Sequence, residues 1–360
     1  MSVKVVLGLQ NGDEGKGRVI DDLVHNATKP VVVRFQGGNN AGHTIYDPQG
    51  QKYVVHGLPS GVLNPNAINI ITRGCVVNPD ELSMEIAQFK VEQGTLIISE
   101  YCPTILPHHV EIDKAIYQGR LGTTAKGIGP AYAAHTSRDA TLLKDWVPEE
   151  GENYLIQSYI GNAEKALRDF ISEGYDVFLE GCQGVRLDLW GDEYPNVTSS
   201  CTTIGAVLSS TRLNHKDIDT VIGVAKVYET KVGNGDFIEL HNELAEDIRQ
   251  KGKEYGSTTG RPRKIGWTDL DQLKEACQVN GVDILILTKT DVIAQVGVLN
   301  VWVDKELVEF KVWGTDCSID DPNLFNFLEF VKRYTGVKEI GYTYGERRGS
   351  IKLIVSTQYQ

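Results

Sequence analysis

The chain has 360 residues, of which 41% are hydrophobic and 23% are charged, a composition typical of globular proteins. Its formal net charge of −12 argues against a protein that coats nucleic acid, and no apolar run reaches the roughly 18 residues that predict a membrane-spanning helix. The first residues lack the basic and apolar regions of a signal peptide, and the six cysteines form no CxxC pair, so we expect a cytoplasmic protein.

Short apolar, β-branched runs alternate with amphipathic stretches along the chain. Runs without polar alternation predict strands buried on both faces, namely Val3–Leu9, Val31–Phe35, Ile68–Ile71, Leu96–Ser99, Val177–Glu180, Val221–Tyr228 and Ile284–Thr288. The amphipathic stretches predict helices, including Arg18–His25, Asp80–Gln93, Ala163–Glu173 and Leu324–Tyr334. This order predicts an α/β fold with a largely parallel central sheet flanked by helices, in which ligands bind beyond the carboxyl ends of the strands.

A glycine-rich segment, QNGDEGKGR from Gln10 to Arg18, follows the first predicted strand and leads into a helix. Backbone N–H groups of such a loop and of the helix start converge on an anion, so the segment predicts a P-loop-like phosphate site. It is not a Walker A loop, because Gln10 and Gly17 stand where that motif has glycine and serine or threonine. With the Mg²⁺-binding hydroxyl missing, the carboxylate of Asp13 is the nearest substitute. The alternative is a plain strand–helix turn.

A second cluster, RFQGGNNAGHT from Arg34 to Thr44, follows the second predicted strand. Its small residues leave the imidazole of His43 accessible, and histidine is the side chain best suited to move a proton near neutral pH. A loop histidine taken alone is more often structural than catalytic. The neighbouring Asn39, Asn40 and Gly42 favour the catalytic interpretation.

Three later segments carry polar groups suited to small anionic ligands. In Ser257–Arg263, the guanidinium groups of Arg261 and Arg263 beside a hydroxyl-rich turn can bind carboxylates, although a solvated basic loop fits the residues equally well. Asp291, two residues after Lys289 at the end of a strand, can accept from the N1–H and N2–H₂ groups of guanine. Thr123, Thr124 and Arg138 suit a 5′-phosphate, and Gln183 and Thr198 supply further polar contacts around a nucleotide.

Seven motifs together make the pattern specific, and their order along the chain resembles that of the adenylosuccinate synthetase family. They are GDEGKG, GGNNAGHT, GTTAKGIGPAY, EGCQG, YPNVTSS, STTGRPR and TKTD. The resemblance covers most of the chain and implies one domain over residues 1–360, with small subdomains appended to the sheet. The length is similar to that of the compact archaeal and phage-encoded members.

The resemblance implies a ligase that phosphorylates O6 of a 6-oxopurine nucleotide and then displaces phosphate with L-aspartate. It implies Asp13, His43 and Lys16 as catalytic residues, with Asp13 taking the N1 proton, His43 acting on the oxygen and Lys16 at the transferring phosphoryl group. Mg²⁺ is expected on the Asp13 carboxylate and the Gly42 carbonyl. The ligand-binding residues that it implies are Asn40, Thr124, Arg138, Gln183 and Thr198 for the monophosphate; Gly12, Gly15, Lys16, Gly17, Lys289, Asp291 and Gly345 for the triphosphate; and Ser257, Thr258, Thr259, Arg261 and Arg263 for aspartate. Family members are homodimers, and Arg138 matches the arginine that crosses to the partner's nucleotide.

Two departures from the family pattern lie next to the base pockets. Asn11 stands where the family has tryptophan, and Glu346 stands where the C-terminal turn has proline. With the compact length, they favour the phage branch that uses dGMP and leads to 2-aminoadenine, with the ordinary enzyme acting on IMP as the close alternative. The same departures suggest that the donor is not strictly GTP. A non-catalytic GTP-binding switch is the remote alternative, and the absent Walker A loop argues against it.

Overall fold

The computed structural model describes residues 2–47, 49–148, 155–256, 260–345 and 348–354. A ten-stranded sheet runs through it in the order β16-β15-β12-β9-β1-β8-β2-β5-β6-β7, and every neighbouring pair is parallel except β15 with β16. Its strands are β1 Val3–Gly8, β2 Pro30–Arg34, β5 Ile68–Ile71, β6 Leu96–Ser99, β7 Ile160–Gly161, β8 Asp176–Gly184, β9 Thr220–Lys226, β12 Ile284–Thr288, β15 Glu339–Thr343 and β16 Ile351–Ile354. The predicted α/β class with a largely parallel sheet is therefore confirmed.

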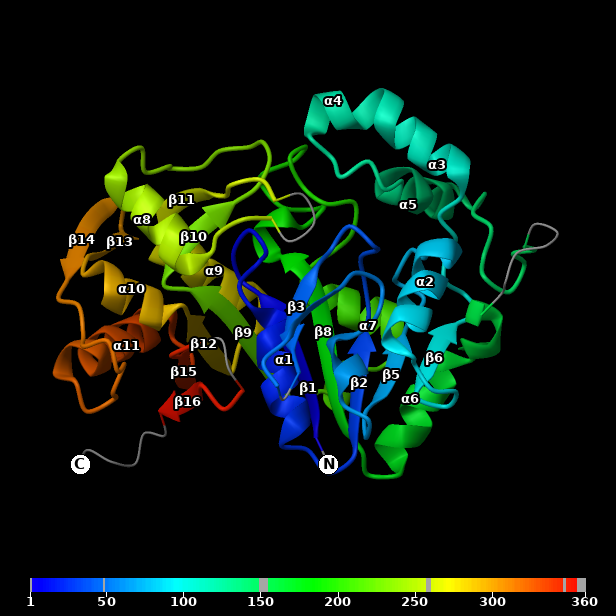
Figure 1. Ribbon diagram of the computed structural model, residues 1–360, viewed down its shortest axis with the longest axis horizontal. Coiled ribbons are helices and arrows are strands. Elements are labelled where there is room, and N and C mark those ends of the chain that lie inside the picture. The colour runs from blue at the N-terminus through cyan, green and yellow to red at the C-terminus, as the bar shows by residue number, and fades with distance from the viewer. Residues whose placement is uncertain (1, 48, 149–154, 257–259, 346–347, 355–360) are drawn as a thin grey trace.

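Helices cover both faces of the sheet (Figure 1). They are α1 Lys16–His25, α2 Pro79–Phe89, α3 Pro107–Ile112, α4 Gln118–Leu121, α5 Ile128–Ser137, α6 Ala163–Ser172, α7 Ile204–Thr211, α8 Glu243–Gly252, α9 Leu270–Asn280, α10 Thr290–Val296 and α11 Pro322–Thr335. Side chains of β1 alternate between two apolar layers. Val5 and Leu7 belong to the large core that includes α6, α7, α9 and α11, whereas Val6 packs with the buried face of α1. This two-sided burial is why the strand sequences lack polar residues.

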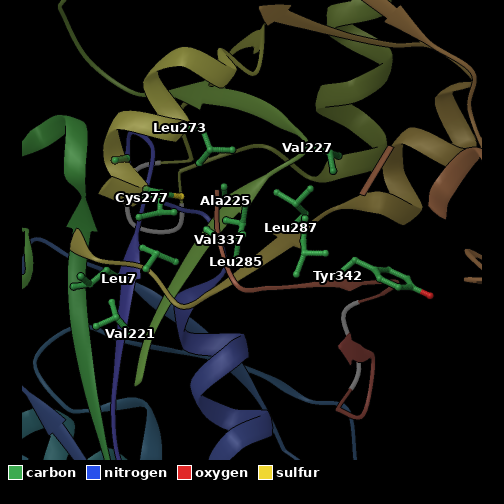
Figure 2. Packing of buried hydrophobic residues seen from close by; sticks show 14 of the residues in the cluster. Leu7, Val221, Ala225, Val227, Leu273, Cys277, Leu285, Leu287, Val337 and Tyr342 are labelled. Atoms are coloured by element: carbon green, nitrogen blue, oxygen red, sulfur yellow. The ribbon is translucent and has the colours of Figure 1, made fainter. Parts of the chain in front are cut away.

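The large core fills the space between the sheet and the helices behind it (Figure 2). Residues from β9 and β12, such as Ala225 and Leu287, meet Leu273 and Cys277 of α9 there, and all four are buried. The six cysteines are unpaired thiols, and burial raises the pKa of Cys277 to about 12. The five buried cysteines thus behave as small apolar side chains, and Cys201 is partly buried.

Three small antiparallel pairs are appended to the sheet, in agreement with the expected subdomains. They are β3 His43–Tyr46 with β4 Lys52–Val55, β10 Tyr228–Lys231 with β11 Lys264–Trp267, and β13 Leu299–Val303 with β14 Glu306–Phe310. Helices α3, α4 and α5 form a further group at one end of the sheet (Figure 1). No helix in the described part of the chain is long and apolar enough to cross a membrane.

The single strand predicted over Val221–Tyr228 is wrong, because the chain leaves the sheet after Lys226. The side chain of Gln10 bonds both backbone groups of Lys226, accepting from its N–H at 2.9 Å and donating to its carbonyl at 3.2 Å. The Gln10 side chain thus takes the place of the next backbone hydrogen bonds between β1 and β9. The strand β10 then begins at Tyr228 and pairs with β11 instead.

Candidate active site

The first glycine loop is organised from within by Glu14. The buried Glu14 carboxylate accepts from the backbone N–H of Gln10 at 3.1 Å and of Gly12 at 2.8 Å, and it binds the ammonium of Lys16 at 2.6 Å. A side chain at Gly8 would strike Glu14 and Lys16, so glycine at the end of β1 makes room for this ion pair. The sequence interpretation gave Glu14 no role, and Lys16 lies beneath the loop with only 3% of its side chain exposed.

The Asp13 carboxylate faces outward from the same loop. Asp13 adopts φ 61°, in the left-handed region, and 36% of its side chain is exposed. Its Oδ2 lies 2.9 Å from a terminal guanidinium nitrogen of Arg263, the last residue of the expected aspartate-binding segment. Two residues predicted for different substrates, Asp13 for the purine and Arg263 for aspartate, are therefore in direct contact.

His43 begins β3 and is fixed by an acid from the centre of the sheet. Its Nδ1 lies 2.5 Å from Glu180 Oε1, and Glu180 also accepts from the backbone N–H of Ser60 at 2.8 Å and from the Ser60 hydroxyl. Burial alone would raise the pKa of Glu180, but the His43 ring and the Ser60 donors outweigh it and hold the pKa below its usual value. With Nδ1 engaged, Nε2 is the ring nitrogen that remains for a ligand.

The two glycine loops are in van der Waals contact at Gly17. A Cβ added to Gly17, in the first turn of α1, would lie 3.1 Å from the Cβ of His43 and 3.0 Å from the Ser60 hydroxyl. The serine or threonine of a Walker A loop would therefore fit only if His43 and Ser60 shifted by a few tenths of an ångström. Glycine at position 17, where a Walker A loop has a hydroxyl residue, leaves room for His43 to pack against the phosphate-binding turn.

Gln183 joins the second glycine loop to the end of β8. It has φ 56°, accepts from Gln36 at 3.3 Å, and donates to Asn40 at 3.5 Å. The Tyr132 hydroxyl from α5 accepts from the N–H of Gly37 at 2.9 Å and donates to the carbonyl of Gly74 at 2.7 Å. Of the residues predicted for the monophosphate, Asn40 and Gln183 are thus in contact, and α5 is fixed beside them.

The other three residues predicted for the monophosphate form no hydrogen bond or ion pair with Asn40 or Gln183 among the interactions of the described residues. Thr198 donates its backbone N–H to the carbonyl of Leu187 at 2.8 Å. Thr124 is exposed just before α5, and Arg138 is exposed at the C-terminal end of α5 with φ 70°. Thr124 and Thr198 are predicted to contact the monophosphate, and Arg138 is predicted to reach the nucleotide of a partner subunit.

Residues predicted for the triphosphate base form another group, near the start of α10. Lys289 adopts φ 69° before the helix and donates to the carbonyl of Gly252 at 2.8 Å, and Asp291 lies in the first helical turn. The Thr290 hydroxyl donates to the carbonyl of Thr343 at 2.6 Å, which ties α10 to the segment that leads to Gly345. Glu346 and the predicted aspartate-binding residues Ser257, Thr258 and Thr259 lie outside the described residues.

A cavity of about 760 Å³ adjoins the second glycine loop on the side of α2 and the β3–β4 hairpin. Gly38, Asn39 and Lys126 line it, together with apolar residues of α2. The predicted catalytic residues Asp13, Lys16 and His43 do not line this cavity.

Comparison with known proteins decides the family. The family model described as adenylosuccinate synthetase matches residues 5–155 and 149–320. The chain belongs to the adenylosuccinate synthetase family. The enzyme of Thermus thermophilus is 36% identical over 95% of this chain and 96% of its own, and that of Halothermothrix orenii is 36% identical over 98% and 94%. The protein is therefore a ligase of the type that forms a carbon–nitrogen bond, and its family binds purine nucleotides and aspartate.

Two solved structures share the fold of this adenylosuccinate synthetase family member. The fully ligated adenylosuccinate synthetase of Plasmodium falciparum has a TM-score of 0.88 and 29% identity, covering 99% of this chain and all of its own. The succinoaminodeoxyadenylate synthetase of cyanophage S-2L, bound to dGMP and dATP, has a TM-score of 0.75 and 20% identity, covering 98% and 95%. At that identity, the likeness to the cyanophage enzyme concerns the fold alone.

Proposed function

We propose that this ligase transfers the γ-phosphoryl group of a nucleoside triphosphate to O6 of a purine nucleoside 5′-monophosphate, and then joins L-aspartate to C6. The amine attacks C6, the C6–O6 bond breaks, and phosphate leaves with O6. The observation that carries this proposal is the packing of His43 against Gly17. It brings a proton-transferring ring, held by Glu180, to the turn where phosphate would bind.

Each predicted catalytic residue has a role that follows from its surroundings. Asp13 is outward-facing and partly exposed, so its carboxylate can accept the N1 proton of a bound 6-oxopurine. His43 would present Nε2 to the developing charge on O6. Backbone N–H groups at Gly15 and Gly17 would bind the phosphates, and Lys16 would assist once its ammonium turns from Glu14 toward them.

The residues present fit a magnesium ion. In the described residues no three acidic, histidine or cysteine side chains converge, and Mg²⁺ characteristically takes one or two carboxylates together with substrate phosphates and water. Asp13, with an exposed oxygen beside the phosphate loop, and the carbonyl of Gly42 would hold it. When bound, it would neutralise charge on the phosphates.

Two acceptors are candidates, each favoured by a specific observation. Asn11, where the family pattern has tryptophan, is buried beside Asp13, and its amide atoms have no hydrogen-bond partner among the described residues. A short amide there favours dGMP, whose C2 amino group needs an acceptor and additional room. The relatives that are 36% identical over nearly their whole length carry the adenylosuccinate synthetase name, which favours IMP.

The exposed position of Arg138 supports the proposed homodimer. An arginine at the end of α5 that faces solvent within its own chain is free to reach a nucleotide bound by a second copy. We further propose that the protein works in the cytoplasm, where its unpaired cysteines remain reduced.

A product assay by mass tests the proposal. IMP and dGMP would each be incubated with L-aspartate, Mg²⁺ and either GTP, ATP or dATP. We expect an N6-succinyl product with at least one acceptor, and ATP or dATP rates at least about a tenth of the GTP rate, since about one base contact is altered. Absence of product from every mixture would refute the proposed function. Strict dependence on GTP would show that Asp291 still determines the donor.

A further inference from the structure

We infer that Glu254 is a positioning residue for the ligation, because it fixes Arg263 between Asp13 and the incoming aspartate. This inference rests on the proposed function. Glu254 follows the end of α8 and is fully buried, with 0% of its surface exposed. Among the predicted ligand-binding residues, its carboxylate forms an ion pair with Arg263, so it would act on aspartate through Arg263.

Three side chains from different elements converge on this carboxylate. Lys226 at the end of β9 binds it at 2.9 Å, the Tyr228 hydroxyl of β10 donates to it at 2.7 Å, and Arg263, just before β11, binds it at 2.5 Å. Burial would raise the pKa of Glu254, but the Lys226, Lys289 and Arg263 charges lower it to about 2. The carboxylate therefore stays ionised throughout the working pH range.

The backbone makes Glu254 and Arg263 a fixed pair. The N–H of Arg263 donates to the carbonyl of Glu254 at 3.0 Å, and the N–H of Gly256 donates to the carbonyl of Arg261 at 2.8 Å. The two residues thus close the base of the loop that carries the predicted aspartate-binding residues. Main chain and side chain together hold the guanidinium of Arg263 in one place.

The two arms of the Arg263 guanidinium have different partners. One terminal nitrogen is held by the buried Glu254, and the other lies 2.9 Å from the partly exposed Asp13. Only the contact with Asp13 can be exchanged for a contact with substrate, because the Asp13 carboxylate must also accept the N1 proton of the purine. A substrate carboxylate can then take the place that Asp13 vacates while Glu254 keeps the guanidinium oriented.

The charges around Glu254 indicate how its removal would affect aspartate binding. Lys226, Arg263, Glu254 and Asp13 form one chain of two cations and two anions. In Glu254→Gln, Asp13 becomes the nearest carboxylate for Arg263. Arg263 would then hold Asp13 more tightly and bind the substrate carboxylate less well.

The test measures the Michaelis constants of Glu254→Gln with whichever acceptor the wild-type enzyme uses. We expect the KM for aspartate to rise about tenfold or more, with the KM for the triphosphate within about twofold, since one charge-assisted contact is lost. Tyr228→Phe is the matched control. It removes a neutral donor to the same carboxylate, and it should change the aspartate KM less than about threefold.

A double variant separates positioning from folding. Glu254→Gln with Lys226→Met removes a buried ion pair together, which proteins tolerate better than an unpaired charge. We expect a raised aspartate KM in the double variant too. A return to the wild-type value would overturn the inference, because Glu254 would then serve only to neutralise Lys226. An unchanged aspartate KM in Glu254→Gln would overturn it as well, whereas failure of the wild-type enzyme to form product refutes the proposed function itself.

Discussion

Neutralising Glu180 should slow catalysis through its effect on His43. In Glu180→Gln the side chain keeps its shape, but one carboxylate oxygen becomes an NH₂ group. The carboxylate accepts from His43 and the Ser60 hydroxyl on one oxygen and from the Ser60 N–H on the other. Since an NH₂ group cannot accept, one orientation of the amide loses the bond from the Ser60 N–H, and the other reverses the bonds to His43 Nδ1 and the Ser60 hydroxyl, which changes the tautomer of the ring.

The expected size follows from the type of hydrogen bond. A bond to a charged group contributes about 1.5–3 kcal/mol and a neutral one about 0.5–1.5 kcal/mol, so the substitution weakens the hold on His43 by about 1–2 kcal/mol. If that energy orients the ring in the transition state, kcat falls about 5- to 30-fold. The KM for aspartate should remain within about twofold, because no contact to Arg263 changes.

Glu164→Gln is the matched control for this variant. Glu164 is also buried, and although burial would raise its pKa, its contacts with Arg73 and Ser99 lower it. Its substitution should reduce the thermal midpoint without changing kcat by more than about twofold. Steady-state kinetics and thermal unfolding of both variants make the comparison. A Glu180→Gln enzyme whose kcat equals that of the wild type would refute the role assigned to the His43–Glu180 pair.

Three further predictions concern the two loops, aspartate and pH. Asp13→Ala and His43→Ala should each reduce the ligation rate by about 10²–10⁴ while binding of the monophosphate remains measurable by calorimetry, and turnover like that of the wild type would contradict the assignment. Arg261→Leu should raise the KM for aspartate far more than the KM for the triphosphate, and an unchanged KM for aspartate would indicate a solvated loop. Burial raises the pKa of Glu229 from 4.5 to about 7, because it outweighs the lowering of the pKa by the nearby Arg186 charge. Folding therefore becomes less favourable as pH rises from 4.5 through 7, where the unfolded chain ionises Glu229 more readily than the folded one. Glu229→Gln should therefore raise the thermal midpoint relative to the wild type at pH 8 and lose that advantage near pH 4.5, and a difference independent of pH would contradict this.

The strands of the sheet could be predicted from the sequence, because burial on both faces leaves a direct record in composition. Ile68–Ile71, Leu96–Ser99 and Ile284–Thr288 have the predicted bounds. The strand predicted to continue to Tyr228 was wrong, since its end depends on Gln10, more than two hundred residues earlier in the chain. The β3–β4 hairpin was missed because its strands are partly exposed and carry polar residues, so they form no continuous apolar run.

The candidate site could be predicted as far as its loops, but not its supporting acids. Asp13 and His43 lie in glycine-rich segments that follow strands, and that local pattern is visible in one sequence. Glu14, Glu180 and Glu254 gave no such signal, because a buried carboxylate is defined by donors from elsewhere in the chain. Glu180 meets His43 from 137 positions away. Acidic residues inside glycine motifs therefore merit the same attention as the residues that point outward.

The fate of the purine oxygen tests the central claim most directly. An acceptor labelled with ¹⁸O at O6, either IMP or dGMP, would be converted with aspartate and unlabelled triphosphate, and the released phosphate analysed by mass spectrometry. The account predicts one ¹⁸O atom in each inorganic phosphate formed, because O6 leaves bonded to the transferred phosphorus. Unlabelled phosphate accompanying the N6-succinyl product would contradict phosphorylation at O6, and with it the roles assigned to Asp13 and His43.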